Sequence, residues 1–170
     1  METNSTRRSK PNILITGTPG TGKTTTASAL AASTQLRHIN IVDLVKEKNL
    51  NHGFNDEIDL ICNEINHMME LGGNIVDYHV CYFFLEEWFD LVVVLQTEIS
   101  ELYDRLINRD YSDSKLKHDI ECEVFEVLLE DAKSSYSEDI VKPMKSNTLD
   151  DVNSNVDTLM AWVQGWQPNA

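Results

Sequence analysis

The sequence of 170 residues has few basic side chains. Fourteen lysines and arginines stand against 28 aspartates and glutamates, which gives a net charge of −14. A surface of this sign repels the phosphates of nucleic acids, so direct non-specific binding to RNA or DNA is not expected. The charge would attract a basic protein, or it serves only to keep the chain in solution. The one basic cluster, at residues 7–10, gives only a weak hint of nuclear targeting.

Cysteine is scarce, and long apolar runs are missing. Cys62, Cys81 and Cys122 are odd in number and form no Cys-x-x-Cys pair, so neither a disulfide framework nor a zinc site is indicated. No apolar run approaches the length of a membrane span, so no membrane partner is expected. The length and an apolar content of 41% fit one globular domain. We expect a monomer with a disordered polar leader at 1–11 and a single domain at 12–170.

The sequence does contain a phosphate-binding signature at residues 17–24. The letters GTPGTGKT satisfy the pattern G-x-x-x-x-G-K-[ST]. An apolar, β-branched run at 12–16 precedes the signature and predicts a buried strand, whereas the Ala- and Leu-rich stretch at 24–32 predicts a helix. Strand, glycine loop and helix in this order point backbone N–H groups at a phosphate, which a chance glycine turn would not do. We therefore predict a nucleoside triphosphate site.

Each residue type in this loop has a defined task. Gly20 and Gly22 permit backbone conformations that a Cβ atom would block. Lys23 is expected to reach the β- and γ-phosphates, and the hydroxyl of Thr24 is expected to bind Mg²⁺. A nucleoside triphosphate and Mg²⁺ are therefore expected to bind here.

Strands and helices alternate along the rest of the chain. Strands are predicted at 12–16, 37–41, 74–77, 91–95 and 140–141. Helices are predicted at 24–32, 42–48, 55–71 and 98–108. One long helix is predicted after residue 114, with an apolar stripe of Leu116, Ile120, Val124, Val127 and Leu128. A capping box of Thr148 and Asp151 predicts the start of a final helix. This alternation favours an α/β domain with a parallel sheet.

Two polar residues outside the loop are candidates for the same site. Asp77 ends a predicted strand, where a carboxylate can hold Mg²⁺ beside the loop; the alternative is a strand-end residue that caps the next turn. Arg109 opens a polar insert between two helices, which can close over phosphates; the alternative is a surface arginine. The sequence contains no Asn-Lys-x-Asp motif, which disfavours a GTPase.

Several motifs together resemble one family. They are NILITGTPGTGKTTT at 12–26, Asp-Tyr-His at 77–79 before a Cys and two Phe, Leu-Tyr-x-Arg-Leu at 102–106, and Ile-x-Cys-Glu-x-Phe at 120–125. With these residues the chain resembles the small nuclear adenylate kinase family, that is, the isoenzyme-six adenylate kinases or ribosome-assembly ATPases, and most closely their plant branch. The resemblance covers nearly the whole chain after the leader.

The resemblance implies a fold and an activity. It implies a P-loop fold with five parallel strands in the order 2-3-1-4-5, an AMP-side insert at about 40–62 and a short lid at about 108–118. It also implies transfer of the γ-phosphoryl group of ATP to AMP, with weaker ATP hydrolysis. A role in small ribosomal subunit maturation, contact with a basic small-subunit ribosomal protein, and a location in nucleus and cytoplasm are implied as well.

The resemblance also implies the site residues. The residues that would bind the ATP phosphates are Gly20, Gly22, Lys23, Thr24, Thr25 and Arg109. Catalysis would fall to Lys23, Asp77, His79 and Arg109, and the metal to Thr24 and Asp77. For His79 the alternative is a histidine that is merely hydrogen-bonded near a strand end.

The chain departs from the family mainly on the acceptor side. In the run at 80–87 a glycine, a carboxylate, a proline and an arginine of the family are absent. Val80 adds a branched side chain, and Glu87 inverts a charge that could face phosphate. The AMP-side segment is shorter, and Asp110 and Asp119 add negative charge to the lid.

Three functions follow from these observations. The first is an ATP–AMP phosphotransferase with accessory ATPase activity. The second is an ATP-binding assembly factor in which AMP phosphorylation is weakened by the altered acceptor side. The third is a kinase for another small acceptor, since P-loop kinases share these parts.

Overall fold

The structure, a computed structural model, describes residues 8–50, 57–109 and 111–168. Its centre is a parallel sheet of five strands in the order β2-β3-β1-β4-β5, which confirms the α/β fold and the strand order predicted from the sequence. The strands are β1 Asn12–Gly17, β2 Arg37–Asn40, β3 Asn74–Asp77, β4 Leu91–Gln96 and β5 Val141–Lys145.

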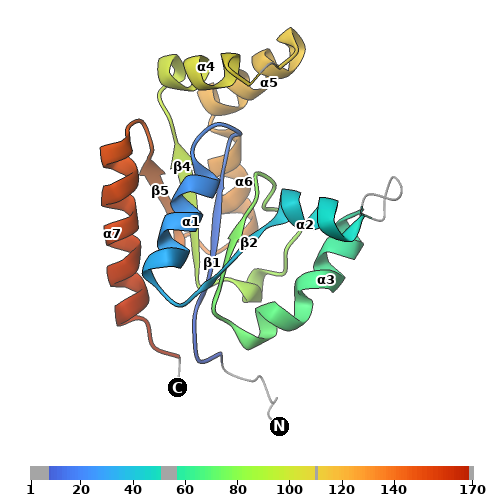
Figure 1. The fold of residues 1–170 in the computed structure, drawn as a ribbon, viewed down its shortest axis with the longest axis vertical. Helices are drawn as coiled ribbons and strands as arrows, with labels where there is room; N and C mark the ends of the chain where they lie inside the picture. Colours follow the sequence, from blue (N-terminus) through green and yellow to red (C-terminus); the bar gives the residue numbers. More distant parts are fainter. Residues whose placement is uncertain (1–7, 51–56, 110, 169–170) are drawn as a thin grey trace.

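Helices cover both faces of this sheet and the edge formed by the carboxyl ends of its strands (Figure 1). They are α1 Lys23–Ser33, α2 Ile41–Lys48, α3 Glu57–Leu71, α4 Ile99–Ile107, α5 Asp113–Val124, α6 Val127–Ser135 and α7 Leu149–Gly165, with a short 3₁₀ turn at Glu86–Trp88. The capping box predicted for Thr148 and Asp151 is present at the start of α7. None of the helices in these ranges combines the length and the apolarity needed to cross a membrane.

The strands are apolar throughout because both of their faces are buried. In β1, Ile13 and Ile15 pack toward α1 and α7, whereas Leu14 points to the opposite face, which α3 and α6 cover. Successive side chains of a strand alternate between the faces, so a strand covered on both sides needs an unbroken apolar run. The carboxyl ends of these rigid strands carry the loops of the candidate site.

The long helix predicted after residue 114 is wrong, because the chain forms two helices there. The break lies at Phe125 and Glu126, and Glu126 adopts a left-handed conformation with φ of 53°. The predicted apolar stripe is interrupted as well, since Val124 and Val127 are exposed. The break lets α6 pack on the sheet while α5 lies beyond the carboxyl ends of the strands, beside α4 (Figure 1).

The predicted leader at 1–11 lies partly outside the described residues, which begin at Arg8. Arg8 donates hydrogen bonds to Asp90 Oδ1 at 2.8 Å and to the carbonyl of Glu87 at 3.0 Å, and Pro11 is buried. These contacts attach residues 8–11 to the amino-terminal edge of the sheet.

Candidate functional site

The phosphate-binding loop joins β1 to α1, as the sequence predicts. Gly22 is the N-cap residue of α1 with φ of 91°, and no side chain caps the helix. The backbone N–H groups of the first turn are therefore left available to an anion, and the helix dipole adds to their attraction. Any other residue at position 22 would be strained by the positive φ.

Gly20 allows a close contact between the loop and α4. Its φ is 96°, and a Cβ atom there would lie 2.9 Å from side-chain atoms of Leu102 and Leu106 in α4. Helix α4 can therefore rest directly on the loop because position 20 has no side chain.

Asp77 stands at the centre of a polar cluster at the carboxyl ends of β1, β2 and β3. Its Oδ2 accepts hydrogen bonds from Thr24 Oγ1 at 2.8 Å and Asn40 Nδ2 at 3.1 Å, and lies 3.0 Å from His38 Nε2. The carboxylate is only 3% exposed, so these partners fix its orientation. The Thr24 hydroxyl proton points at Asp77, which leaves oxygen lone pairs for a cation. Hard oxygen ligands of this kind suit Mg²⁺.

The sequence reasoning missed His38 and Asn40 as members of this cluster. The register places Asn40 directly beside Asp77, with β2 next to β3 in the sheet. The predicted strand order already implied this, because carboxyl ends of neighbouring parallel strands meet at one edge. Asn40, a polar residue near the end of the second predicted strand, could therefore have been predicted to lie beside Asp77.

Lys23 holds a charge in a nearly buried position. Burial lowers its pKa from the ordinary value of 10.5 to about 8; nearby Asp77 opposes this shift, and Arg109 adds to it. Its one hydrogen bond, from Nζ to the carbonyl of Thr18, is long at 3.4 Å. The ammonium is thus still charged at neutral pH and only weakly engaged, which suits it to bind a phosphate.

His79 follows Asp77 into the same cleft but carries no charge at neutral pH. Burial, together with the positive charges of Lys23 and Lys115, lowers its pKa from 6.5 to about 4 against the opposing effect of Asp77. A neutral imidazole donates one hydrogen bond and accepts another. His79 can therefore orient a phosphate or a water, but it does not supply positive charge.

These side chains line one cleft of about 650 Å³ between the loop, the carboxyl ends of β2 and β3, and α5 with α6. The structure brings five of the predicted site residues to it: Lys23, Thr24, Asp77, His79 and Arg109. Gly20, Gly22 and Thr25 do not line it. A cleft of this size is in the range of small-molecule sites.

The residues that depart from the family pattern lie in different places. Val80 lines the cleft, so its branched side chain takes space beside His79. Glu87 is exposed, and its carbonyl is bonded to Arg8 near the amino-terminal edge of the sheet. The charge of Glu87 therefore does not face the phosphate-binding loop, which lies at the opposite edge of the sheet. Asp110 lies outside the described residues.

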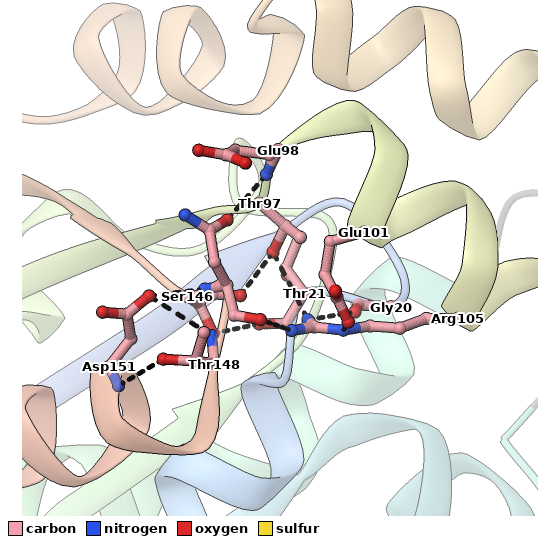
Figure 2. Close-up of polar contacts among 10 residues, drawn as sticks. Gly20, Thr21, Thr97, Glu98, Glu101, Arg105, Ser146, Thr148 and Asp151 are labelled. Atoms are coloured by element: carbon pink, nitrogen blue, oxygen red, sulfur yellow. Dashed lines mark hydrogen bonds and ion pairs between the residues drawn. The ribbon is translucent and has the colours of Figure 1, made fainter.

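Arg105 in α4 is a further residue whose role the sequence did not indicate. Its guanidinium donates to the carbonyl of Gly20 at 3.0 Å, to the carbonyl of Asn147 at 2.7 Å and to Glu101 Oε2 at 3.1 Å (Figure 2). Ser146 Oγ also donates to the carbonyl of Thr21 at 2.7 Å. The phosphate-binding loop is thereby tied to α4 and to the connection between β5 and α7.

Replacing Arg105 by methionine is expected to lower the free energy of unfolding by about 1–3 kcal/mol, because two carbonyl groups lose charge-assisted partners. Urea denaturation measures this change. The exposed Arg37, replaced by methionine, is the matched control. A loss of unfolding free energy no larger than that of the control would contradict the role of Arg105 in holding the phosphate-binding loop.

Glu123 fastens α5 to the loop from the other side. Its Oε1 accepts from Thr18 Oγ1 and its Oε2 from the backbone N–H of Thr97, both at 2.7 Å. Both carboxylate oxygens are therefore used to hold α5 over the cleft.

The fold and the site together define a P-loop kinase. The same fold occurs in shikimate kinase from Bacteroides thetaiotaomicron, with a TM-score of 0.66 and 18% identity over 91% of this chain and 98% of that one. A gluconokinase from Sinorhizobium meliloti gives a TM-score of 0.55 at 14% identity, over 94% of this chain and 100% of that one.

Sequence comparison identifies the family. A family model described as an AAA domain matches residues 13–126. The adenylate kinase isoenzyme 6 homolog of Dictyostelium discoideum is 44% identical over 167 residues, which cover 94% of this chain and 95% of that protein. The homolog named FAP7 in Saccharomyces cerevisiae is 36% identical over 168 residues, which cover 94% and 85%. The chain belongs to the adenylate kinase isoenzyme 6 family and is an adenylate-kinase-like nucleotide kinase.

Proposed function

We propose that the protein transfers the γ-phosphoryl group of ATP to AMP and forms two molecules of ADP, with weaker Mg²⁺-dependent hydrolysis of ATP as a side reaction. The observation that carries this proposal is the convergence of Lys23, Arg109 and the Thr24–Asp77 pair on one cleft beside an uncapped helix N-terminus. The relatives named adenylate kinase support AMP as the acceptor.

Each group has a task in this reaction. Thr24 and Asp77 would hold Mg²⁺, which neutralises phosphate charge when it is bound. The N–H groups at the start of α1 and the ammonium of Lys23 bind the donor phosphates, and Arg109 supplies charge from the lid. Neutral His79 orients the acceptor phosphate or, when no acceptor is present, a water.

The acceptor half of the cleft is built from the ends of β2 and β3. Asn40, Asp43 and Tyr78 line it together with Val80. Because Val80 occupies space next to His79, we expect AMP to be a slower acceptor here than in an ordinary adenylate kinase. The phosphate-binding loop itself keeps its motif unchanged.

An acceptor panel tests the proposal. Initial rates of ADP formation are measured with ATP and Mg²⁺ alone and with AMP, dAMP or CMP added. We expect AMP to raise the rate above the rate without acceptor, and CMP to have little effect. A rate unchanged by every acceptor would contradict the kinase proposal and leave an ATPase, whereas a preference for CMP would contradict AMP as the acceptor.

A second proposed function is that of an ATP-dependent assembly factor for the small ribosomal subunit. The net charge of −14 favours it, because an acidic surface is complementary to a basic ribosomal protein. The proposed location is the nucleus and the cytoplasm. In cells depleted of their own homolog, a variant that binds ATP but does not phosphorylate AMP should then restore subunit maturation. If the unaltered protein restores subunit maturation and that variant does not, an assembly role independent of AMP phosphorylation would be contradicted.

A further inference from the structure

Asp119, in the middle of α5, carries a buried carboxyl group. The residue is only 5% exposed, and it lines the same cleft as Lys23 and Arg109. Within the described residues its buried Oδ2 makes no hydrogen bond. Burying a carboxylate oxygen without a hydrogen-bond donor costs free energy. A bound ligand that donates to this oxygen, or a proton on it, would remove that cost.

Among the residues that the structure describes, no basic side chain pairs with Asp119. On its own helix, the ammonium of Lys115 lies over the ring of Tyr111 at 4.3 Å, and the ring of His118 faces the thiol of Cys122 at 3.6 Å. From α1, Lys23 is bonded to the loop carbonyl, and Arg109 approaches from the end of α4.

Burial raises the pKa of Asp119 above its usual value, and it outweighs the opposing influence of the basic side chains named above. A triphosphate would bind the charges of Lys23 and Arg109 and bring further negative charge into the cleft. The bound nucleotide therefore removes support for the charged form of Asp119 and favours its protonated form.

We propose that Asp119 is a further residue of the nucleotide site, which takes up one proton from solvent when a triphosphate binds and then donates a hydrogen bond from its carboxylic acid group to a phosphate oxygen. The proposal rests on the proposed function, since it takes the cleft to be the phosphate site. It follows that nucleotide affinity falls as pH rises, because the bound state holds the extra proton.

The test compares proton uptake by the unaltered protein and by Asp119→Asn, whose amide has the same shape, keeps a donor and does not titrate. Isothermal calorimetry with the β,γ-imido analogue of ATP and Mg²⁺ is run at pH 6, 7 and 8 in two buffers of different ionisation enthalpy. Asp119→Ser, a smaller neutral replacement, gives a second comparison, and thermal unfolding verifies that each variant is folded. Glu121→Gln, an exposed acid-to-amide change in the same helix, is the control.

We expect the unaltered protein to take up more protons per nucleotide than Asp119→Asn, by a difference of up to about one. We also expect its affinity to fall relative to that variant by up to about tenfold per pH unit where Asp119 titrates. Glu121→Gln should behave as the unaltered protein. The subtraction removes protons taken up by the nucleotide itself. It is evaluated at pH 6 and 7, where Lys23, with a pKa of about 8, is mostly charged before the nucleotide binds.

Two results would overturn the proposal. Equal proton uptake by the two proteins would show that Asp119 keeps its charge state. Weaker binding by Asp119→Asn at every pH without a proton difference would assign the carboxylate to a cation instead. A protein that binds no nucleotide at all would contradict the proposed function itself, which separates the two failures.

Discussion

Replacing Lys23 by methionine is expected to weaken nucleotide binding by about 100-fold or more, because the phosphates lose a charge-assisted hydrogen bond in a nearly buried site. Turnover should fall further, since the ammonium also acts on charge that develops during transfer. Calorimetry with MgADP and initial rates with ATP and AMP measure the two effects. Lys133→Met, an exposed change of the same type, is the control.

The loss of binding will not come from unfolding. Folding lowers the pKa of Lys23 from 10.5 to about 8, so below pH 8 the folded protein bears the full cost of burying the charge. This cost disappears as pH rises toward 10.5. Lys23→Met lacks the charge at every pH, and we expect it to be at least as stable as the unaltered protein at pH 7. A less stable variant at pH 7 would contradict this interpretation.

The same shift predicts a pH limit for the unaltered protein. As pH rises through about 8 the free ammonium loses its proton, so binding should weaken above this pH. Nucleotide binding by the Lys23→Met variant should not weaken further above pH 8.

Replacing Asp77 by asparagine is expected to lower the apparent affinity for Mg²⁺ by about 10- to 100-fold and turnover by at least as much. The amide keeps the shape of the carboxylate but loses its charge. Its oxygen can still take the place of the one that Thr24, Asn40 and His38 contact, so the loss falls on the metal. The measurements are rates at varied Mg²⁺ and nucleotide binding with and without the metal.

Nucleotide binding without Mg²⁺ separates this role from general damage. Asp77→Asn removes a negative charge from the phosphate site, so metal-free ADP should bind as tightly as before or more tightly. The exposed Asp104→Asn in α4 is the matched control. Equal losses with and without Mg²⁺ would show that Asp77 supports the fold of the site and not the metal.

The parts of the fold that the sequence predicts well are those with strong local signals. The run at 91–95 is apolar throughout and forms the buried β4, and the glycine loop forms between β1 and α1. The break between α5 and α6 has no such signal. Neither glycine nor proline marks it, and Glu126 adopts positive φ because the packing of α6 on the sheet requires the chain to turn.

The site shows the same division. Lys23 and Thr24 follow from a motif, whereas His38 and Asn40 depend on the register between β2 and β3. Arg105 reaches the loop only because α4 packs on Gly20, which a pattern of side-chain types along the chain does not reveal. Local chemistry is thus readable from the sequence, and contacts between distant elements require the fold.

The central claim is that the cleft transfers a phosphoryl group to AMP, and the fate of the γ-phosphate tests it directly. The protein is incubated with ATP labelled at the γ-phosphate, Mg²⁺ and AMP, and the label in ADP and in inorganic phosphate is counted. Our account predicts that most label appears in the β-phosphate of ADP and that this product is lost in Lys23→Met. Label found only in inorganic phosphate, at a rate independent of AMP, would contradict it.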